Sequence, residues 1–236
     1  MPRFIYRAHG LALAGHLRRP VLRQLEPVAA CVLPSVGGQA VSQAGAFQLQ
    51  DPATGALLLA FESAETRVEG SESAAGVYRT QVRAVVRGLR ILDMLRAEEV
   101  SAALTITYRR ADRNLSVDAA DSRLTGLTLA GRAYRIALDH ALSSEASDYA
   151  AFRQRHPDLP ESRGVTRYSL ARHPELSFEP WEAGRLDRTG FGRIYFCEWS
   201  ASHHTQSLTM LRLRLGSQAE GELEVGTVEV NGNDFP

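Results

Sequence analysis

The feature that most constrains this chain is an alternation of apolar and polar residues, which is clearest in its last third. Residues 193–202 and 207–215 form two extended runs, joined by the short polar link 203–206. Two extended runs separated by a few polar residues are typical of a β-hairpin. We therefore predict that the C-terminal third contains a pair of antiparallel strands.

The second of these runs also predicts which of its faces is buried. Leu211, Leu213 and Leu215 share one face of an extended strand, because successive side chains point to opposite sides. Arg212 and Arg214 share the other face. Burying an unpaired guanidinium group costs far more free energy than burying leucine. We therefore expect the three leucines to face the core and the two arginines to lie opposite.

Similar alternation recurs along most of the chain. Residues 78–87 alternate apolar and polar side chains, and residues 3–17 read as a long first strand. Residues 89–99 fit either one short helix or an irregular crossing. Many short strands with regular turn signals predict a mainly β fold, an antiparallel sandwich or barrel. No long linker divides the chain, so we expect a single domain over residues 1–236.

One segment has the pattern of a helix. Residues 145–156 can be capped at the start by Ser144 or Ser147, and Pro157 follows their end. We therefore expect a short helical insertion in the β domain, at residues 143–163.

The overall charge argues against polyanionic partners. The chain has 236 residues with a formal net charge of +0, and all 27 of its basic residues are arginine. A nucleic-acid or anionic-membrane binder usually carries a basic excess, so we expect neither partner. Near-zero net charge tolerates self-association. The sequence lacks a run of about 20 apolar residues that could span a membrane. It also shows no conventional signal peptide at its start, so we expect a protein that is cytoplasmic, or exported without one.

The reactive residues do not form a recognisable catalytic or metal motif. Cys31 and Cys197 lie in apolar runs and are expected to be reduced core thiols, and nothing in the sequence supports a disulfide between them. Cys197, Glu198 and His203 share the last hairpin, but Cys197 has the surroundings of a packed core residue. His203 and His204 beside Glu198 are better explained by a solvated turn than by a metal site. We expect no catalytic residue, metal or cofactor, and hence no enzyme; a triad assembled from distant strands stays open.

Two sets of residues are candidates for binding. Trp181 lies among turn residues and is the best exposed aromatic side chain, and Tyr195 is a second ligand-binding candidate. Two rows of arginines on strand faces are either solvated or paired with carboxylates of a neighbouring copy. These candidate interface arginines are Arg79, Arg83, Arg87, Arg212 and Arg214.

Four stretches of the chain resemble a family of uncharacterised bacterial proteins. They are Val82 to Asp93, Leu124 to Asp139, Gly190 to Gly192, and Thr209 to Gly216. The resemblance covers most of the chain and implies a bacterial origin and a β-rich fold. The family has no established activity, so no functional residue is carried over.

These observations favour a non-enzymatic structural or interaction subunit that forms a homo-oligomer. The many strands have edges that need cover, and residues 3–9 are a candidate for strand addition between copies. The partner could also be an unknown protein. The alternative is a β-sandwich module that binds a ligand such as a carbohydrate.

Overall fold

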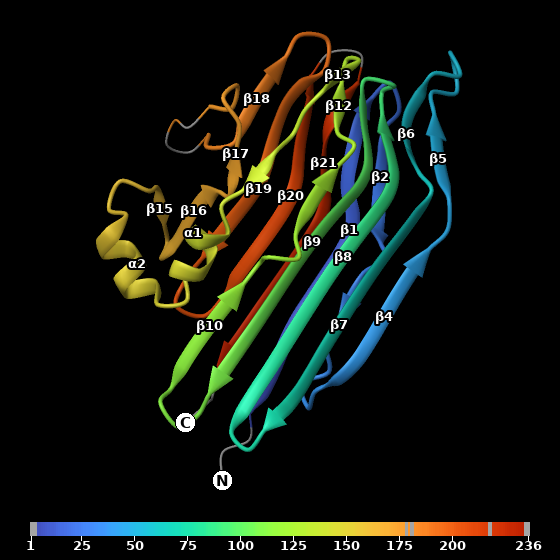
Figure 1. Cartoon of the computed structure of the whole chain (residues 1–236). Helices are drawn as coiled ribbons and strands as arrows, with labels where there is room; N and C mark the ends of the chain where they lie inside the picture. The colour runs from blue at the N-terminus through green and yellow to red at the C-terminus, as the bar shows by residue number, and fades with distance from the viewer. Residues whose placement is uncertain (1–3, 178, 180–181, 217–218, 234–236) are drawn as a thin grey trace.

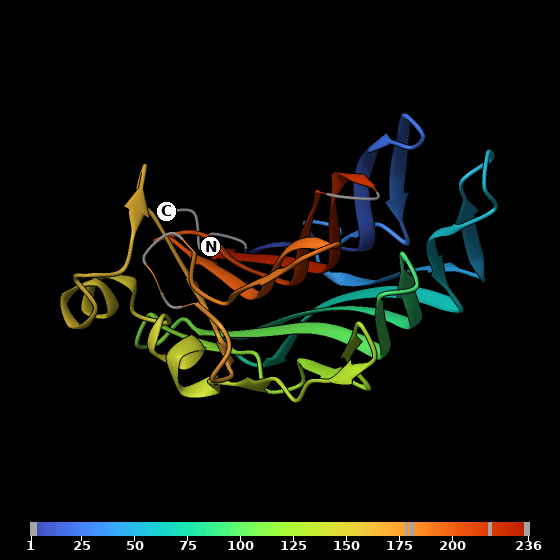
Figure 2. The same cartoon turned by 90° about the horizontal axis from the view of Figure 1, so that it is seen from above.

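The computed structural model describes residues 4–177, 179, 182–216 and 219–233. Two large antiparallel sheets pack face to face, and two short helices lie at one end of this sandwich (Figures 1 and 2). In the described residues neither sheet closes into a barrel. The mainly β fold predicted from alternation is therefore confirmed as a sandwich. None of the helices in this part of the chain has the length and hydrophobicity needed to cross a membrane.

The first sheet, sheet A, contains the predicted C-terminal hairpin. Its strand order is β15 (Glu161–Ser162), β16 (Val165–Ser169), β19 (Gly192–Ala201), β20 (Gln206–Gly216), β21 (Glu220–Asn233), β1 (Ile5–Arg19) and β2 (Arg23–Val28). In addition, β18 (Arg185–Arg188) pairs with β19, and β3 (Cys31–Val32) pairs with β1. Leu211, Leu213 and Leu215 are buried, and Arg212 and Arg214 project from the other face, as predicted.

The second sheet, sheet B, is built from the middle of the chain. Its main order is β13 (Arg132–Ala133), β12 (Thr128–Leu129), β9 (Leu95–Arg109), β8 (Val77–Ile91), β6 (Leu57–Phe61) and β5 (Phe47–Gln50). Beside this path, β7 (Ser63–Ala74) pairs with β8 and with β4 (Gly38–Ala44), while β10 (Asn114–Asp118) and β11 (Arg123–Thr125) pair with β9. A third, two-stranded sheet joins β14 (Ala137–Leu138) to β17 (Ala171–Arg172).

Residues 89–99 are neither a helix nor an irregular crossing. They complete β8 and begin β9, and the tight turn between the strands holds Leu92 and Asp93 at φ of 52° and 49°. Two consecutive positive φ values are typical of a type I′ hairpin turn, which usually carries asparagine or glycine. The turn was missed because Leu92 is an unusual residue for it.

The helical insertion overlaps the expected residues 143–163, but it begins earlier and contains two helices rather than one. They are α1 (His140–Glu145) and α2 (Tyr149–Arg155). Asp139 and Asp148 cap them by accepting hydrogen bonds from backbone N–H groups of the first turn. The predicted cap Ser147 instead accepts a hydrogen bond from the N–H of Val117. The serine therefore ties the insertion to β10.

The buried side chains form one contiguous hydrophobic cluster. In several long strands, however, the buried positions switch between even-numbered and odd-numbered residues along the strand. In β20 both Met210 and Leu211 are fully buried, because inward positions are even-numbered before this point and odd-numbered after it. The same level in the neighbouring strands is occupied by Ala12, Cys197 and Gly226. Cys197 and Gly226 adopt left-handed φ values of 50° and 65°, which accompany the change of face.

Sheet B has a matching change of parity. Its row consists of Glu62, Gly88, Glu98 and Gly126, and Gly88 has φ of 63°. The two rows lie at nearby levels of the sandwich, since a Cβ on Gly226 would lie 3.4 Å from a methyl group of Val100, two residues from Glu98. The core therefore continues past these two rows, although in each sheet the inward-pointing residues change there between even-numbered and odd-numbered positions.

The start of β1 is not a free edge, contrary to the expectation for residues 3–9. From Ile5 onward, β1 pairs with β21 on one side. On its other side, the N–H of Leu33 donates to the carbonyl of Ala8, and the N–H of Tyr6 donates to the carbonyl of Ser35. Both edges of this segment are thus occupied within the chain.

Candidate functional site

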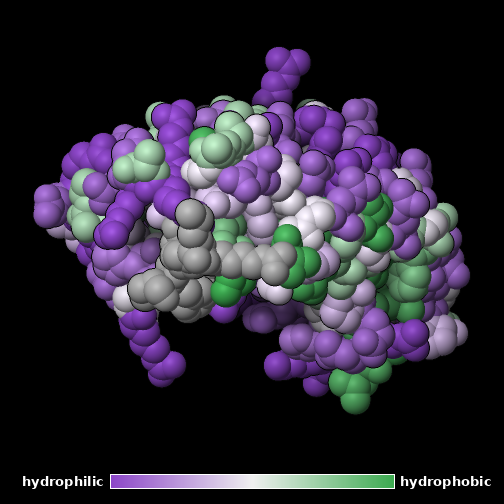
Figure 3. Space-filling model, turned by 90° about the horizontal axis from the view of Figure 1, so that it is seen from below, coloured by the Kyte–Doolittle hydropathy of each residue, from purple (hydrophilic) through white to green (hydrophobic). Residues whose placement is uncertain are grey.

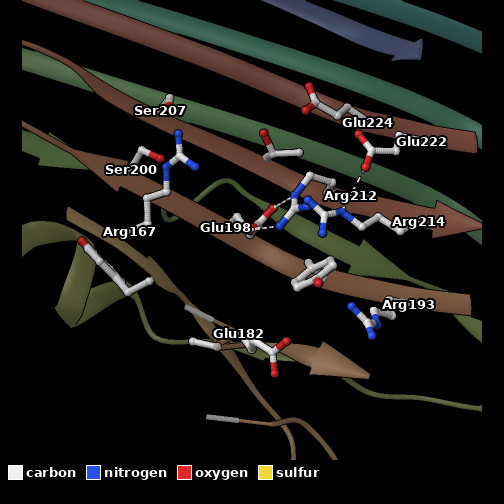
Figure 4. Close-up of a pocket in the computed structure, with 14 residues that line it drawn as sticks. Arg167, Glu182, Arg193, Glu198, Ser200, Ser207, Arg212, Arg214, Glu222 and Glu224 are labelled. Atoms are coloured by element: carbon white, nitrogen blue, oxygen red, sulfur yellow. Dashed lines mark hydrogen bonds and ion pairs between the residues drawn. The ribbon is translucent and has the colours of Figure 1, made fainter. Parts of the chain in front are cut away.

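A polar groove lies on the outer face of sheet A. It has a volume of about 530 Å³ and crosses β16, β19, β20 and β21 beneath residues 182–183 (Figure 4). Four arginines and four glutamates line it, together with the hydroxyl groups of Ser200, Ser207 and Thr209. Its formal charges therefore balance, and its walls offer both hydrogen-bond donors and acceptors.

The centre of the groove is a fixed ion pair. Nε of Arg212 donates to one carboxylate oxygen of Glu198 at 2.5 Å, and Nη2 donates to the other at 2.6 Å. The same guanidinium group lies 4.0 Å from the centroid of the Tyr195 ring, within the range of a cation–π contact. Burial lowers the pKa of Arg212, but the Glu198 carboxylate outweighs this and raises it. Arg212 therefore stays charged and contacts both Glu198 and Tyr195.

Most other charges of the groove are also paired within the chain. Arg214 contacts Glu222 at 3.1 Å, and Glu182 contacts Arg185. Arg193 is 3.5 Å from Asp187. These contacts leave few charged groups for a ligand.

The exceptions are Arg167 and Glu224, which form no ion pair in the described parts of the chain. Burial raises the pKa of Glu224, and the nearby Arg212 opposes that shift. These two groups lie on β16 and β21, the outermost strands of the groove. A ligand that contacts both would be an extended one.

The structure places one of the two predicted ligand-binding aromatics in this groove. Tyr195 lines it but is only 3% exposed, because Arg212 covers its ring. Trp181 lies outside the described residues, although the next residue, Glu182, lines the groove. Their role in binding stays a prediction.

The candidate interface arginines mostly have partners within the chain. On sheet B, Arg83 and Arg87 approach Glu99 at 3.9 and 3.2 Å, and Arg123 approaches it at 2.5 Å. Arg79 is exposed. Contacts between these rows and a neighbouring copy stay a prediction.

The candidate reactive residues of the last hairpin are held by packing. Cys31 and Cys197 are free thiols. Cys197 is fully buried, and burial raises its pKa to about 12, so it carries no thiolate at neutral pH. The His203 ring packs edge-on against Tyr149 at 4.8 Å between centroids. Among the described residues, no three histidine, cysteine or acidic side chains are arranged to hold a metal ion.

A second site is the free edge of sheet B. Strand β4 pairs only with β7 among the described strands, and it lies at the right-hand margin of the molecule in Figure 1. None of its seven residues is buried, and Val41 at its centre is 46% exposed. Residues 27–50, which include β4 and β5, contain no charged side chain and no histidine. This run is a signal that the sequence analysis missed.

The polar side chains of β4 are held in a defined orientation. Nη2 of Arg67 donates to Oε1 of Gln39 at 3.0 Å. Nε2 of Gln43 donates to a carboxylate oxygen of Glu65 at 2.7 Å. A guanidinium group can only donate and a carboxylate can only accept, so these partners fix both amides. Within the described parts of the chain, the nitrogen of Gln39 is left as a free donor and the oxygen of Gln43 as a free acceptor.

Comparison with known proteins identifies a family but no characterised relative. Residues 4–176 match the family model described as Domain of unknown function (DUF8256). Neither curated proteins nor solved structures give a match. Strand β4 and its partner β7 lie within the matched residues, whereas β19, β20 and β21, which form most of the groove, lie beyond them.

Proposed function

The chain belongs to the DUF8256 family, whose function is unknown, and we propose that it is a non-enzymatic interaction subunit that binds a partner strand along β4. The observation that carries this proposal is the free, uncharged edge of sheet B. An extended segment added there would satisfy the outward backbone groups of β4.

The chemistry of β4 supports this role. Soluble proteins usually protect a free edge with lysine, other charges, proline or a bulge. Strand β4 has none of these residue types, and its register with β7 is regular from Gly38 to Ala44. Figure 3 shows the molecule from below, with polar residues over most of this surface and hydrophobic residues in separate groups. An uncharged and regular edge favours backbone pairing with another strand.

Hydrogen exchange at β4 tests the proposal. A labelled synthetic peptide with the sequence of residues 36–46 is added to the wild-type chain and to Val41→Lys, and exchange is followed in residues 37–45. The amides of β4 that point to β7 are protected in any case, so the test concerns the outward ones. We expect these outward amides to be protected in the wild type, either by the peptide or by another strand already present. Val41→Lys should remove that protection, because a charge on the edge opposes strand addition.

A matched control is Leu22→Lys, since Leu22 is 86% exposed and lies before β2, on the other sheet. This variant should keep the protection of β4. Rapid exchange of the outward β4 amides in the wild type, with or without the peptide, would overturn the proposed function.

The groove on sheet A supports a second candidate, a module for an extended, hydroxyl-rich ligand such as a carbohydrate. The observation that favours it is the pair of charged groups that have no ion-pair partner among the described residues, Arg167 and Glu224, beside the three hydroxyl groups. A glycan array tests it with the wild type, Trp181→Ala and Glu224→Gln. Binding that both substitutions weaken would support the candidate, and absence of binding by the wild type would remove it.

A further inference from the structure

We infer that the strand that pairs with β4 is β4 of a second copy of this chain, antiparallel and related by a two-fold axis through Val41. This inference rests on the proposed role of the β4 edge and names its partner. Antiparallel pairing of one strand with its own copy is self-complementary by symmetry, and it closes after two copies. Each β4 edge then covers the other.

The sequence of β4 favours one register. With Val41 opposite Val41 of the second copy, Gln39 comes opposite Gln43, Ala40 opposite Ser42, and Gly38 opposite Ala44. Every pair then joins residues of similar size, with valine opposite valine and glutamine opposite glutamine. A shift of two residues in the pairing would place glutamine opposite valine. The strand is thus nearly palindromic about its central residue.

The orientation of the two glutamine amides supports the same register. Gln39 has free N–H donors because its oxygen already accepts from Arg67. Gln43 has a free acceptor because its nitrogen already donates to Glu65. Opposite each other across the two-fold axis, Gln39 of one copy can donate to Gln43 of the other.

This contact would complete a hydrogen-bond chain from Arg67 of one copy, through Gln39 and Gln43, to Glu65 of the second copy. The axis generates the chain twice, once on each side of the Val41 pair. Linked hydrogen bonds that begin at a cation and end at an anion strengthen one another. The charged groups themselves stay on β7, so like charges are not brought face to face at the new seam.

Cysteine pairs test the register without disturbing the glutamines. Ala40 and Ser42 lie on the face of β4 opposite Gln39 and Gln43. Side chains directly opposite in antiparallel strands have Cβ atoms about 4.5–5.5 Å apart, and a disulfide needs a short Cβ separation. We expect Val41→Cys to form a disulfide-linked dimer under mild oxidation. Ala40→Cys and Ser42→Cys should each stay unlinked alone but form the linked dimer when mixed.

The native cysteines do not interfere with the readout, since Cys31 and Cys197 are buried. Native mass measured on the same samples separates the two proposals. If β4 is protected only when the peptide is added and the chain stays monomeric, the edge accepts strands but the second copy is not its partner. If a dimer forms that Val41→Lys does not dissociate and Val41→Cys does not link, another surface joins the copies and this inference fails, while the exchange test on β4 still decides the proposed function. Cross-linking of Ala40→Cys or Ser42→Cys alone would overturn the register.

Discussion

Strands β20 and β4 show how differently two parts of one sandwich are used. Strand β20 is paired on both sides, buries leucines on its inner face, and carries paired charges on its outer face. Among the described strands, β4 is paired on one side only; none of its side chains is fully buried, and it carries no charge. Interactions that stabilise the monomer are therefore concentrated at β20, whereas the outward backbone groups and the glutamine amides of β4 can still form hydrogen bonds with a partner.

The largest effect should come from the inner face of β20. Leu213 is fully buried, so Leu213→Ala should lower the free energy of unfolding by roughly 2–5 kcal/mol, the usual cost of truncating a core leucine. Urea denaturation of the monomer measures this. Val41→Ala is the matched test on β4 and should change monomer stability by less than about 0.5 kcal/mol. Equal losses for the two variants would remove the contrast between the strands.

The buried thiol next to β20 should make stability depend on alkaline pH. An unfolded cysteine has a pKa of about 8.5, whereas burial raises the pKa of Cys197 to about 12. The folded state therefore holds a proton that the unfolded state loses. The resulting stability is fully present below about pH 8.5 and is lost as pH rises towards 12, at up to about 1.4 kcal/mol per pH unit.

Denaturation of the wild type and Cys197→Ala across this pH range tests the thiol. The pKa of buried Tyr168 is also raised, so this residue adds a pH dependence of the same sign to both proteins. The difference between their two pH profiles therefore reports Cys197 alone. Parallel pH profiles for the two proteins would contradict the assignment.

An intermediate effect is expected from the ion pair on the outer face. Glu198→Gln removes the negative charge that accepts two hydrogen bonds from Arg212. The side chain of Glu198 is only 26% exposed and that of Arg212 only 20%. The free energy of unfolding should fall by about 1–3 kcal/mol, the range for hydrogen bonds to charged groups. A double-mutant cycle with Arg212→Gln measures the coupling. A coupling energy near zero would show that this pair contributes no more than a solvated one.

A small effect is expected from a more exposed ion pair on the same face of β20. Arg214 and Glu222 are each about half exposed, so Arg214→Ala should cost under about 1 kcal/mol. The measurement is denaturation at low and high salt. If Arg214→Ala instead leaves the monomer unchanged and dissociates an assembly, the arginine row of β20 is an interface, as one reading of the sequence proposed.

Alternation along the chain was enough to predict strands, the final hairpin and the buried leucines of β20. It was not enough to predict that Met210 and Leu211 are both buried, because the change of parity depends on left-handed residues in two neighbouring strands. Nor does alternation show which strands are neighbours, so the pairing of β1 with β21 and the covering of residues 3–9 were missed. The groove had no local motif, since its charged residues come from four strands and a loop. The β4 edge did have a signal, the uncharged run 27–50.

The central claim is that β4 joins two copies through the hydrogen bonds of Gln39 and Gln43. Sedimentation equilibrium from micromolar to millimolar concentration tests it most directly, with wild type, Gln39→Glu and Gln48→Glu. In Gln39→Glu the new carboxylate can still accept from Arg67, but it has no N–H donor. It would therefore place an acceptor opposite the acceptor oxygen of Gln43 in the second copy. Gln48→Glu adds the same charge on the neighbouring edge strand β5 and serves as the control. We expect a wild-type dimer of 25.9 kDa chains, a dissociation constant on the order of 100-fold higher for Gln39→Glu, and little change for Gln48→Glu. A wild-type mass of one chain at every concentration, or equal weakening by the two substitutions, would contradict the claim.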